Sequence, residues 1–482
     1  MKTLFFFLVI AITHNAVTAQ NVGIGTTTPT EKLQVTGNIK ADTIKPNGIK
    51  LTPNAGTGKI LISDAAGVGT WQASSMLAGA GNIGYGVWGD CATNGNISEY
   101  QPVADATGAT GDLFGTNVAI SGNFAIIGAS QDDVGTNSAQ GSASIYQWNG
   151  GSWVLMQKIT DATGDIGDRF GISVSISGNY AIIGAYLDDV GANSSQGSAS
   201  IYQWNGSSWV LMQKITDASG AAFDQFGRSV SISGNYAIIG ADGDEVGANA
   251  SQGSASIYQW NGSNWVLMQK ITDAAGEAND DFGSSVSISG SYAIIGAFQD
   301  DEGGITNAGS ASIYVRFLNG WLLQAKITDA VGAQNDFFGN NVSISGSYAI
   351  IGSFQDDVSL NTNQGSASIY KREGSSWVLM KKMTDGGGAA EEDFGTSVCI
   401  SEDYAIVGAR YGKGMNGTPG TVFIYLRVGF GWQLLQKVTD PGSTGSESFG
   451  VSVAIDGNIK RFLCGANGYG LSSGKVLFGK IN

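Results

Sequence analysis

The sequence predicts an all-β protein: a seven-bladed β-propeller of four-stranded antiparallel blades, preceded by a short extended β stalk. Its composition favours strands and tight turns, because the 482 residues include 73 Gly and only 6 Pro. A Phe-Gly pair recurs seven times, 56 residues apart except for the last step of 55. Seven self-similar units of this length indicate a repeat architecture. The phenylalanines are Phe114, Phe170, Phe226, Phe282, Phe338, Phe394 and Phe449.

Each unit divides into four short strands. Within residues 170–217, alternating apolar residues and turn signals predict strands over 174–177, 180–185, 198–204 and 209–216. Gly and Asn residues separate the first pair and the last pair, as tight hairpins require. Four antiparallel strands in every unit are typical of a propeller blade.

The two ends of the repeat region predict that the ring closes. The seventh unit stops after its third strand, near residues 475–481, and residues 97–105 occupy the position of a fourth strand in other units. A strand from the N-terminal side would therefore complete the last blade. An open solenoid would expose strand edges and would need capping units that the sequence lacks.

The first residues predict export. Lys2 precedes an apolar run, and Val17-Thr18-Ala19 has the small-residue pattern of a cleavage site, so residues 1–19 are interpreted as a secretory signal peptide. The apolar run is shorter than the ~20 residues that a membrane-spanning helix needs. We therefore expect a secreted or cell-surface protein with no membrane insertion.

Three further segments follow the signal peptide. Residues 20–73 are expected to form the extended β stalk, residues 74–96 a Gly-rich linker, and residues 97–482 the propeller. The stalk resembles the N-terminal stalks of fibre-like surface proteins in Bacteroidetes-type bacteria. Because such extended β segments often associate in threes, the resemblance implies a homotrimer as one arrangement.

Charge and residue content exclude several classes of function. The net charge of −15 would repel a nucleic-acid backbone, so we expect no nucleic-acid partner. The single histidine, His14, lies within the predicted signal peptide, which leaves no His for a Ser-His-Asp or Cys-His catalytic system. Three cysteines, Cys91, Cys399 and Cys464, allow at most one disulfide.

A Gly-Ala or Gly-Ser pair follows each Phe-Gly pair, as in Ile183-Gly184-Ala185. This seven-fold pattern resembles the FG-GAP repeat of the integrin α-subunit propeller and its bacterial relatives, over residues 97–482. The resemblance implies a seven-bladed propeller and, from the integrin members, adhesion and ligand binding at the face that carries the loops between blades.

One departure concerns calcium, which many members of that family bind in an Asp-rich hairpin between the first two strands of a blade. Here five of those hairpins read Ser-Gly-Asn or Ser-Gly-Ser, and only Glu402-Asp403 and Asp456 supply acids in the other two. Because calcium needs six to eight oxygen ligands, several of them charged, the family's calcium site is not carried over to any position of this chain.

Acidic residues gather instead at the opposite ends of the strands, in a group that we name the acidic rim. An Asp precedes each Phe-Gly pair by nine residues, and another acid precedes it by two. Blades one to five add an acidic pair between strands two and three, which predicts a calcium-binding or cation-bridged face. Alternatively, these acids only shape turns. The pairs are Asp132-Asp133, Asp188-Asp189, Asp244-Glu245, Asp300-Asp301 and Asp356-Asp357.

The repeat is broken in blades six and seven, where other residues replace the acidic pair. Arg410, Tyr411 and Lys413 stand there in blade six, and Tyr469 stands there in blade seven. Basic and aromatic groups beside acids suit an anionic or sugar ligand, so these four are the candidate ligand-binding residues. The alternative is that closing blades differ because they seal the ring.

The overall interpretation is a non-catalytic binding or adhesion scaffold that uses its loop-rich acidic face to bind an extracellular protein or glycan. Two alternatives stay open. The first is a lectin-like glycan-binding module, in which the paired Trp residues of the outer hairpins, such as Trp204 and Trp209, stack on sugars instead of packing against each other. The second is a carbohydrate-active enzyme that works without His.

Overall fold

The computed structural model describes residues 97–412, 420–440, 448–468 and 473–482, together with four short strands nearer the N-terminus. The predicted signal peptide and Gly-rich linker lie outside the described residues. The chain divides into two compact units, Met1–Asn82 and Ile83–Asn482. In the first unit, β1 (Val22–Ile24) pairs in parallel with β2 (Leu33–Val35), and β3 (Lys59–Ser63) pairs antiparallel with β4 (Gly69–Ala73). The predicted trimer stays a prediction.

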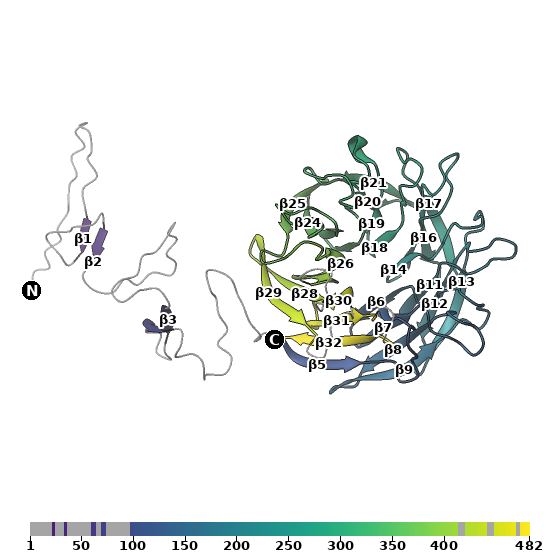
Figure 1. Ribbon diagram of the computed structural model, residues 1–482, viewed down its shortest axis with the longest axis horizontal. Coiled ribbons are helices and arrows are strands. Elements are labelled where there is room, and N and C mark those ends of the chain that lie inside the picture. Colours follow the sequence, from purple (N-terminus) through teal and green to yellow (C-terminus); the bar gives the residue numbers. More distant parts are fainter. Residues whose placement is uncertain are drawn as a thin grey trace, which may run out of the picture. The chain divides into compact units, whose positions relative to one another are not determined.

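The second unit contains seven four-stranded antiparallel sheets among its described residues, which confirms the predicted fold class. Figure 1 shows them as blades arranged around a centre. Blades one to three consist of β6 (Phe114–Ser121), β7 (Phe124–Ala129), β8 (Ser142–Trp148) and β9 (Trp153–Ile159); β10 (Ser173–Ser177), β11 (Tyr180–Ala185), β12 (Ser198–Trp204) and β13 (Trp209–Ile215); and β14 (Ser229–Ser233), β15 (Tyr236–Ala241), β16 (Ser254–Trp260) and β17 (Trp265–Ile271).

The remaining blades repeat this order, from the inner strand to the outer strand. They are β18 (Ser285–Ser289), β19 (Tyr292–Ala297), β20 (Ser310–Phe317) and β21 (Gly320–Ile327); β22 (Val342–Ser345), β23 (Tyr348–Ser353), β24 (Ser366–Glu373) and β25 (Ser376–Met383); β26 (Phe394–Ser401), β27 (Tyr404–Ala409), β28 (Thr421–Val428) and β29 (Gly431–Thr439); and β30 (Phe449–Asp456), β31 (Arg461–Ala466), β32 (Lys475–Ile481) and β5 (Ile97–Val103).

The ring closes as the sequence predicts. β5, the first strand of this unit, pairs antiparallel with β32, the last, with Val103 opposite Val476 and Ile97 opposite Ile481. The inner strands contact one another in a closed cycle, β6 to β10, β14, β18, β22, β26, β30 and back to β6. The two chain ends of the unit therefore complete one blade (Figure 1).

The Phe of each Phe-Gly pair lies between neighbouring blades. Phe226, which is 1% exposed, packs against Ile182 and Ile201 of blade two and Ile239 of blade three. Gly227 follows it with φ +93°, and a Cβ atom there would lie 2.2 Å from the carbonyl oxygen of Ser198. Only Gly permits that backbone approach. The pair thus fixes one blade onto the next.

Helical structure is nearly absent from the described residues, which contain one 3-10 turn, η2 (Glu302–Gly304). None of their helices has the length and apolar character needed to cross a membrane. Cys399 and Cys464 are free thiols, whereas Cys91 lies outside the described residues.

Candidate functional site

The first acid of each rim pair forms an ion pair inside the protein. Lys214, on the outer strand β13, places its Nζ atom 2.6 Å from Asp188 and 2.8 Å from Asp161, which precedes the blade. Both carboxylates are largely buried. One lysine therefore joins the loop between strands two and three to the connection between blades, and it supplies the cation that two close carboxylates need. The same arrangement involves Lys158 with Asp105 and Asp132, Lys270 with Asp217 and Asp244, Lys326 with Asp273 and Asp300, and Lys382 with Asp329 and Asp356.

The second acid of a rim pair shapes its loop. The Asp133 carboxylate accepts a hydrogen bond from the backbone N–H of Ala139 at 2.8 Å, and the Asp189 carboxylate accepts one from Ser195 at 2.7 Å. Asp301 and Asp357 accept equivalent bonds from Asn307 and Asn363. Glu245 replaces Asp at this position in blade three.

The second acids of the rim pairs therefore form turns through backbone hydrogen bonds, whereas calcium binding by the rim stays a prediction. Among the described residues, no group of three or more His, Cys, Asp or Glu side chains has an arrangement that could hold a metal ion. The lysine ammonium groups lie where a bridging cation would have to bind.

In blades one to six, the acid two residues before the Phe is buried and its pKa is raised. Burial, which disfavours the carboxylate, raises the pKa of Asp168, Asp280 and Asp336 to about 6, and repulsion from a nearby rim Asp adds to the shift. Each carboxylate accepts a hydrogen bond from the backbone N–H three residues earlier, at 2.6–2.7 Å. In blade six, burial and then Asp385 raise the pKa of Glu392 to about 8.

The candidate ligand-binding residues divide into two groups. Arg410 and Tyr411 follow β27, in the loop that corresponds to the acidic pairs of other blades. The Nε atom of Arg410 lies 2.7 Å from Asp393, and its guanidinium lies 4.8 Å from the centre of the Tyr411 ring. Lys413 and Tyr469 lie outside the described residues.

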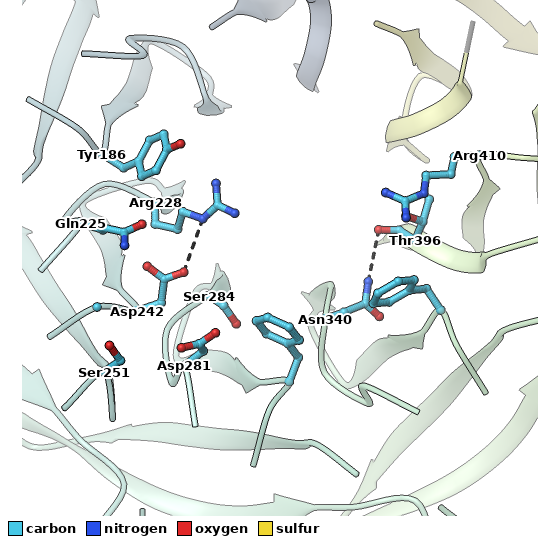
Figure 2. Close-up of a pocket in the computed structure, with 13 residues that line it drawn as sticks. Tyr186, Gln225, Arg228, Asp242, Ser251, Asp281, Ser284, Asn340, Thr396 and Arg410 are labelled. Carbon is cyan, nitrogen blue, oxygen red and sulfur yellow. Dashed lines mark hydrogen bonds and ion pairs between the residues drawn. The ribbon is translucent and has the colours of Figure 1, made fainter. Parts of the chain in front are cut away.

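Arg410 also lines a pocket of ≈ 550 Å³ that sequence reasoning did not identify (Figure 2). We name it the central pocket. Its lining comes from blades two to six, at the strand ends that carry the rim loops. One position supplies five residues: the residue directly after Gly-Ala or Gly-Ser. These are Tyr186, Asp242, Phe298, Phe354 and Arg410.

Two more repeat positions supply most of the remaining lining. The residue after Phe-Gly contributes Arg228, Ser284, Asn340 and Thr396, and the residue before Phe-Gly contributes Gln225 and Asp281. Gly243 and Ser251 complete the lining. The residue before Phe-Gly has positive φ in every blade, from 49° at Ser448 to 64° at Arg169. This uncommon conformation belongs to the turn that inserts Phe between blades, and it places the residues flanking the pair at the mouth of the ring.

The central pocket carries charges from opposite sides. Figure 2 shows Arg228 and Arg410 pointing toward its centre from different blades. The Nε atom of Arg228 lies 3.4 Å from Asp242, and the Arg228 guanidinium stacks 4.9 Å from the centre of the Tyr186 ring. Burial raises the pKa of Asp242 despite this neighbour. Burial raises the pKa of Asp281 to about 6, and Gln299 donates a hydrogen bond to its carboxylate.

Aromatic rings form another part of the wall. Phe337 stacks on Phe354 with ring centres 5.5 Å apart and an interplanar angle of 16°, and it lies 5.6 Å from Phe298. The Arg410 guanidinium lies 5.6 Å from the centre of the Phe354 ring. The pocket therefore combines an apolar surface with charged and neutral polar groups, as small-molecule sites commonly do.

A signal for the central pocket was present in the sequence. The position after Gly-Ala or Gly-Ser reads Ser130, Tyr186, Asp242, Phe298, Phe354, Arg410 and Asn467, seven residues of six types in a chain whose strands are otherwise nearly identical. Comparing the seven units column by column would have identified it. The variation indicates a site, however, only if the equivalent positions of different blades lie close together around one axis.

The Trp residues of the outer hairpins mainly pack against other rings. Trp209 is 2% exposed and lies edge-on to Phe124 of the preceding blade, with ring centres 5.2 Å apart. Trp265 meets Tyr180 in the same way. Trp204 is partly exposed but contacts both Phe124 and Trp209. These contacts join neighbouring blades.

Six stretches of the chain match the FG-GAP repeat family, at residues 101–146, 153–202, 209–258, 265–314, 321–370 and 377–425. Each begins in the outer strand of one blade and ends in the third strand of the next. The boundaries of the family repeat thus differ from those of the blade, and each repeat contains strands of two neighbouring blades. A search of curated proteins found no match. Since the matched stretches cover more than half of the 482 residues and the fold is a closed ring of seven blades, the chain belongs to the FG-GAP repeat family.

Proposed function

We propose that this protein is an exported, non-catalytic binding or adhesion scaffold that recognises an extracellular protein or glycan at the central pocket. One observation carries the proposal: the three positions at which the repeat units differ most visibly converge on one cavity. A scaffold requires the repeated residues to be alike, whereas a recognition site requires different side chains at defined places. The acidic pairs of the rim stand in the same loops as the lining residues Tyr186, Asp242, Phe298 and Phe354.

The ion pairs of the two lining arginines support binding over catalysis. Asp393 engages Arg410, and Asp242 engages Arg228, so both arginines have fixed orientations. Fixed polar groups favour recognition because little conformational freedom is lost when a ligand binds. A His-independent carbohydrate-active enzyme remains the alternative, since the raised pKa of Asp281 would suit an acid catalyst. Release of reducing sugars or unsaturated products from a polysaccharide would support that alternative.

Two matched arginine variants test the proposal. Arg410 and Arg427 each form an ion pair and lie over an aromatic ring, but Arg410 lines the pocket whereas Arg427 lies on the hairpin end, beside Asp403 and Tyr348. We expect Arg410→Ala to weaken binding to the extracellular protein or glycan found in a screen by about tenfold or more, because an arginine in a buried centre is a typical hot spot. Arg427→Ala should leave binding unchanged.

Melting curves establish whether both variants are folded. Equal binding by wild type and Arg410→Ala, or loss of binding only in Arg427→Ala, would place recognition elsewhere and overturn the proposal.

A further inference from the structure

Three buried polar atoms of the residues that line the central pocket have no hydrogen-bond partner among the described residues. One is Oδ1 of Asp242, whose residue is 8% exposed and whose other carboxylate oxygen faces Arg228. The backbone N–H groups of Asp242 and Gly243 lie near this carboxylate, but no donor has hydrogen-bond geometry at Oδ1. The others are the Oγ atom of Ser284, in the adjacent blade, and Oδ1 of Asn340, one blade further along. A buried acceptor without a donor is costly, so such atoms call for an explanation. All three residues line the pocket (Figure 2).

The lining of the pocket suits a ligand that donates hydrogen bonds but carries no net charge. A carboxylate oxygen only accepts, so the partner of Asp242 Oδ1 must carry an O–H or N–H group. The charged lining residues balance, with Arg228 and Arg410 against Asp242 and Asp281. A cationic ligand would face two arginines, and an anionic ligand would face two carboxyl groups. The remaining polar lining, including Gln225, Asn340 and Thr396, is neutral.

The aromatic wall gives the ligand a second property. Phe298 and Phe354 line the pocket on the two blades that follow Asp242, and Phe337 links their rings. The negative face of an aromatic ring attracts weakly positive C–H groups. A ligand that shows C–H groups on one side and hydroxyl groups around its edge therefore suits this wall and the acceptors together.

We propose that the central pocket binds a neutral saccharide, whose hydroxyl groups donate to Asp242 and Ser284 and whose ring lies against Phe298 or Phe354. The inference rests on the proposed function and names its ligand class. The volume of ≈ 550 Å³ lies in the ordinary range of small-molecule sites, about 300–1,000 Å³. Because the lining combines different residues from five blades, binding has a stoichiometry of one saccharide per chain. A lectin that used each outer hairpin would bind several.

The test uses the full chain and a panel of neutral oligosaccharides built from hexoses, deoxyhexoses and N-acetylhexosamines. Sulfated and uronate-containing oligosaccharides and an oligolysine peptide serve as charged comparators. We expect at least one neutral oligosaccharide to bind, with calorimetry giving one site per chain. Asp242→Asn and Ser284→Ala should each weaken that binding by about tenfold or more, since a buried acceptor of a hydroxyl proton is lost or altered.

The matched control is Thr116→Ala, which changes the same repeat position as Ser284 in blade one, outside the pocket lining. It should bind the oligosaccharide like wild type. Ser284→Ala removes one oxygen atom and is not expected to unfold the chain, which its melting curve verifies.

Several results would overturn the inference. No neutral oligosaccharide binding at millimolar concentration, binding of charged comparators alone, or a loss of binding in Trp204→Ala with none in Ser284→Ala would each do so. If a protein ligand still binds through Arg410 while every saccharide fails, the saccharide inference is wrong and the proposed function stands. If Arg410→Ala, Asp242→Asn and Ser284→Ala all leave the binding of every ligand unchanged, both are wrong.

Discussion

The Phe of each Phe-Gly pair stabilises the contact between two blades. Phe226 is surrounded by side chains of blades two and three. We expect Phe226→Ala to lower the free energy of unfolding by about 3–5 kcal/mol, because it removes a buried ring and leaves a cavity. Denaturant titration measures the change.

Phe223 provides the matched control, since it belongs to the same connection between blades, also has positive φ, and is 64% exposed. Phe223→Ala should change stability by less than about 0.5 kcal/mol. A loss below about 1 kcal/mol in Phe226→Ala would contradict the burial of its ring.

Buried carboxyl groups make stability depend on pH in an unusual direction. Asp168, Asp280 and Asp336 have folded-state pKa values of about 6, above the ordinary 3.8, because burial favours the protonated form. Their stabilising contribution is complete below pH 3.8 and is lost as pH rises through about 6. The melting temperature should therefore rise when pH is lowered from 8 to 5.

The rim acids that precede each blade act in a different pH window. Burial raises the pKa of Asp161, but hydrogen bonds from Lys214 and Thr163 outweigh burial and lower it below 3.8. Its contribution is lost only as pH falls below 3.8, so stability should decline again in strong acid. The triple variant Asp168→Asn, Asp280→Asn, Asp336→Asn should flatten the rise between pH 8 and 5. The same slope in this variant as in wild type would rule out these groups as its cause.

Outer strands and connections between blades are joined by the lysine bridges. Lys214 of β13 neutralises Asp161 and Asp188, so Lys214→Met leaves two largely buried carboxylates close together. We expect Lys214→Met to lower the free energy of unfolding by ~2 kcal/mol, a value between the cost of breaking a buried ion pair and that of breaking an exposed one. Lys371→Met, which breaks the more exposed pair with Glu373, should cost no more than about 0.5 kcal/mol.

The same lysine variants test the calcium prediction for the rim. Melting with millimolar calcium, with magnesium and with chelator should leave the wild type unchanged, because Lys214 already supplies a cation to Asp188. In Lys214→Met, calcium should recover part of the lost stability, as an ion that binds only the native state does. A clear rise in the wild type would support calcium binding by the rim pairs.

The closed ring depends on contacts between its first and last strands. Gln101 of β5 donates from Nε2 to the Trp153 carbonyl and accepts from the Trp153 N–H, as Gln157 does with Trp209 one blade later. On the hairpin end, Asp456 accepts from the Gly122 N–H at 2.8 Å, where Ser121 accepts from Gly178 in the next blade. Blade seven therefore joins blade one through the same positions that join the others.

Removal of β5 tests closure for the whole ring. A chain that begins at residue 104 lacks Ile97–Val103 and exposes the edge of β32. We expect aggregation and a lower melting temperature, because an unpaired strand edge recruits other strands. A chain that begins at residue 95 retains β5 and should behave as the full chain does. Equal solubility and melting of both truncations would argue against closure by β5.

The sequence by itself determined the blade count, the strand limits to within a residue in blade two, and the closing strand. Observed β11 and β12 match residues 180–185 and 198–204, because period-two alternation and Gly turns are local signals.

Only the tertiary structure decided where the variable residues lie and what the acidic residues contact. In the sequence, the rim acids resemble an unoccupied cation site. In the structure, lysines some 26 to 53 residues away form ion pairs with them, as Lys214 does with Asp188 and Asp161. Tyr186, Asp242, Asp281 and Arg410 are separated by up to 224 residues and nevertheless line one pocket. The physical reason is the symmetry of the ring: each repeat places the same position at the same radius, so side chains that differ between blades meet at its centre.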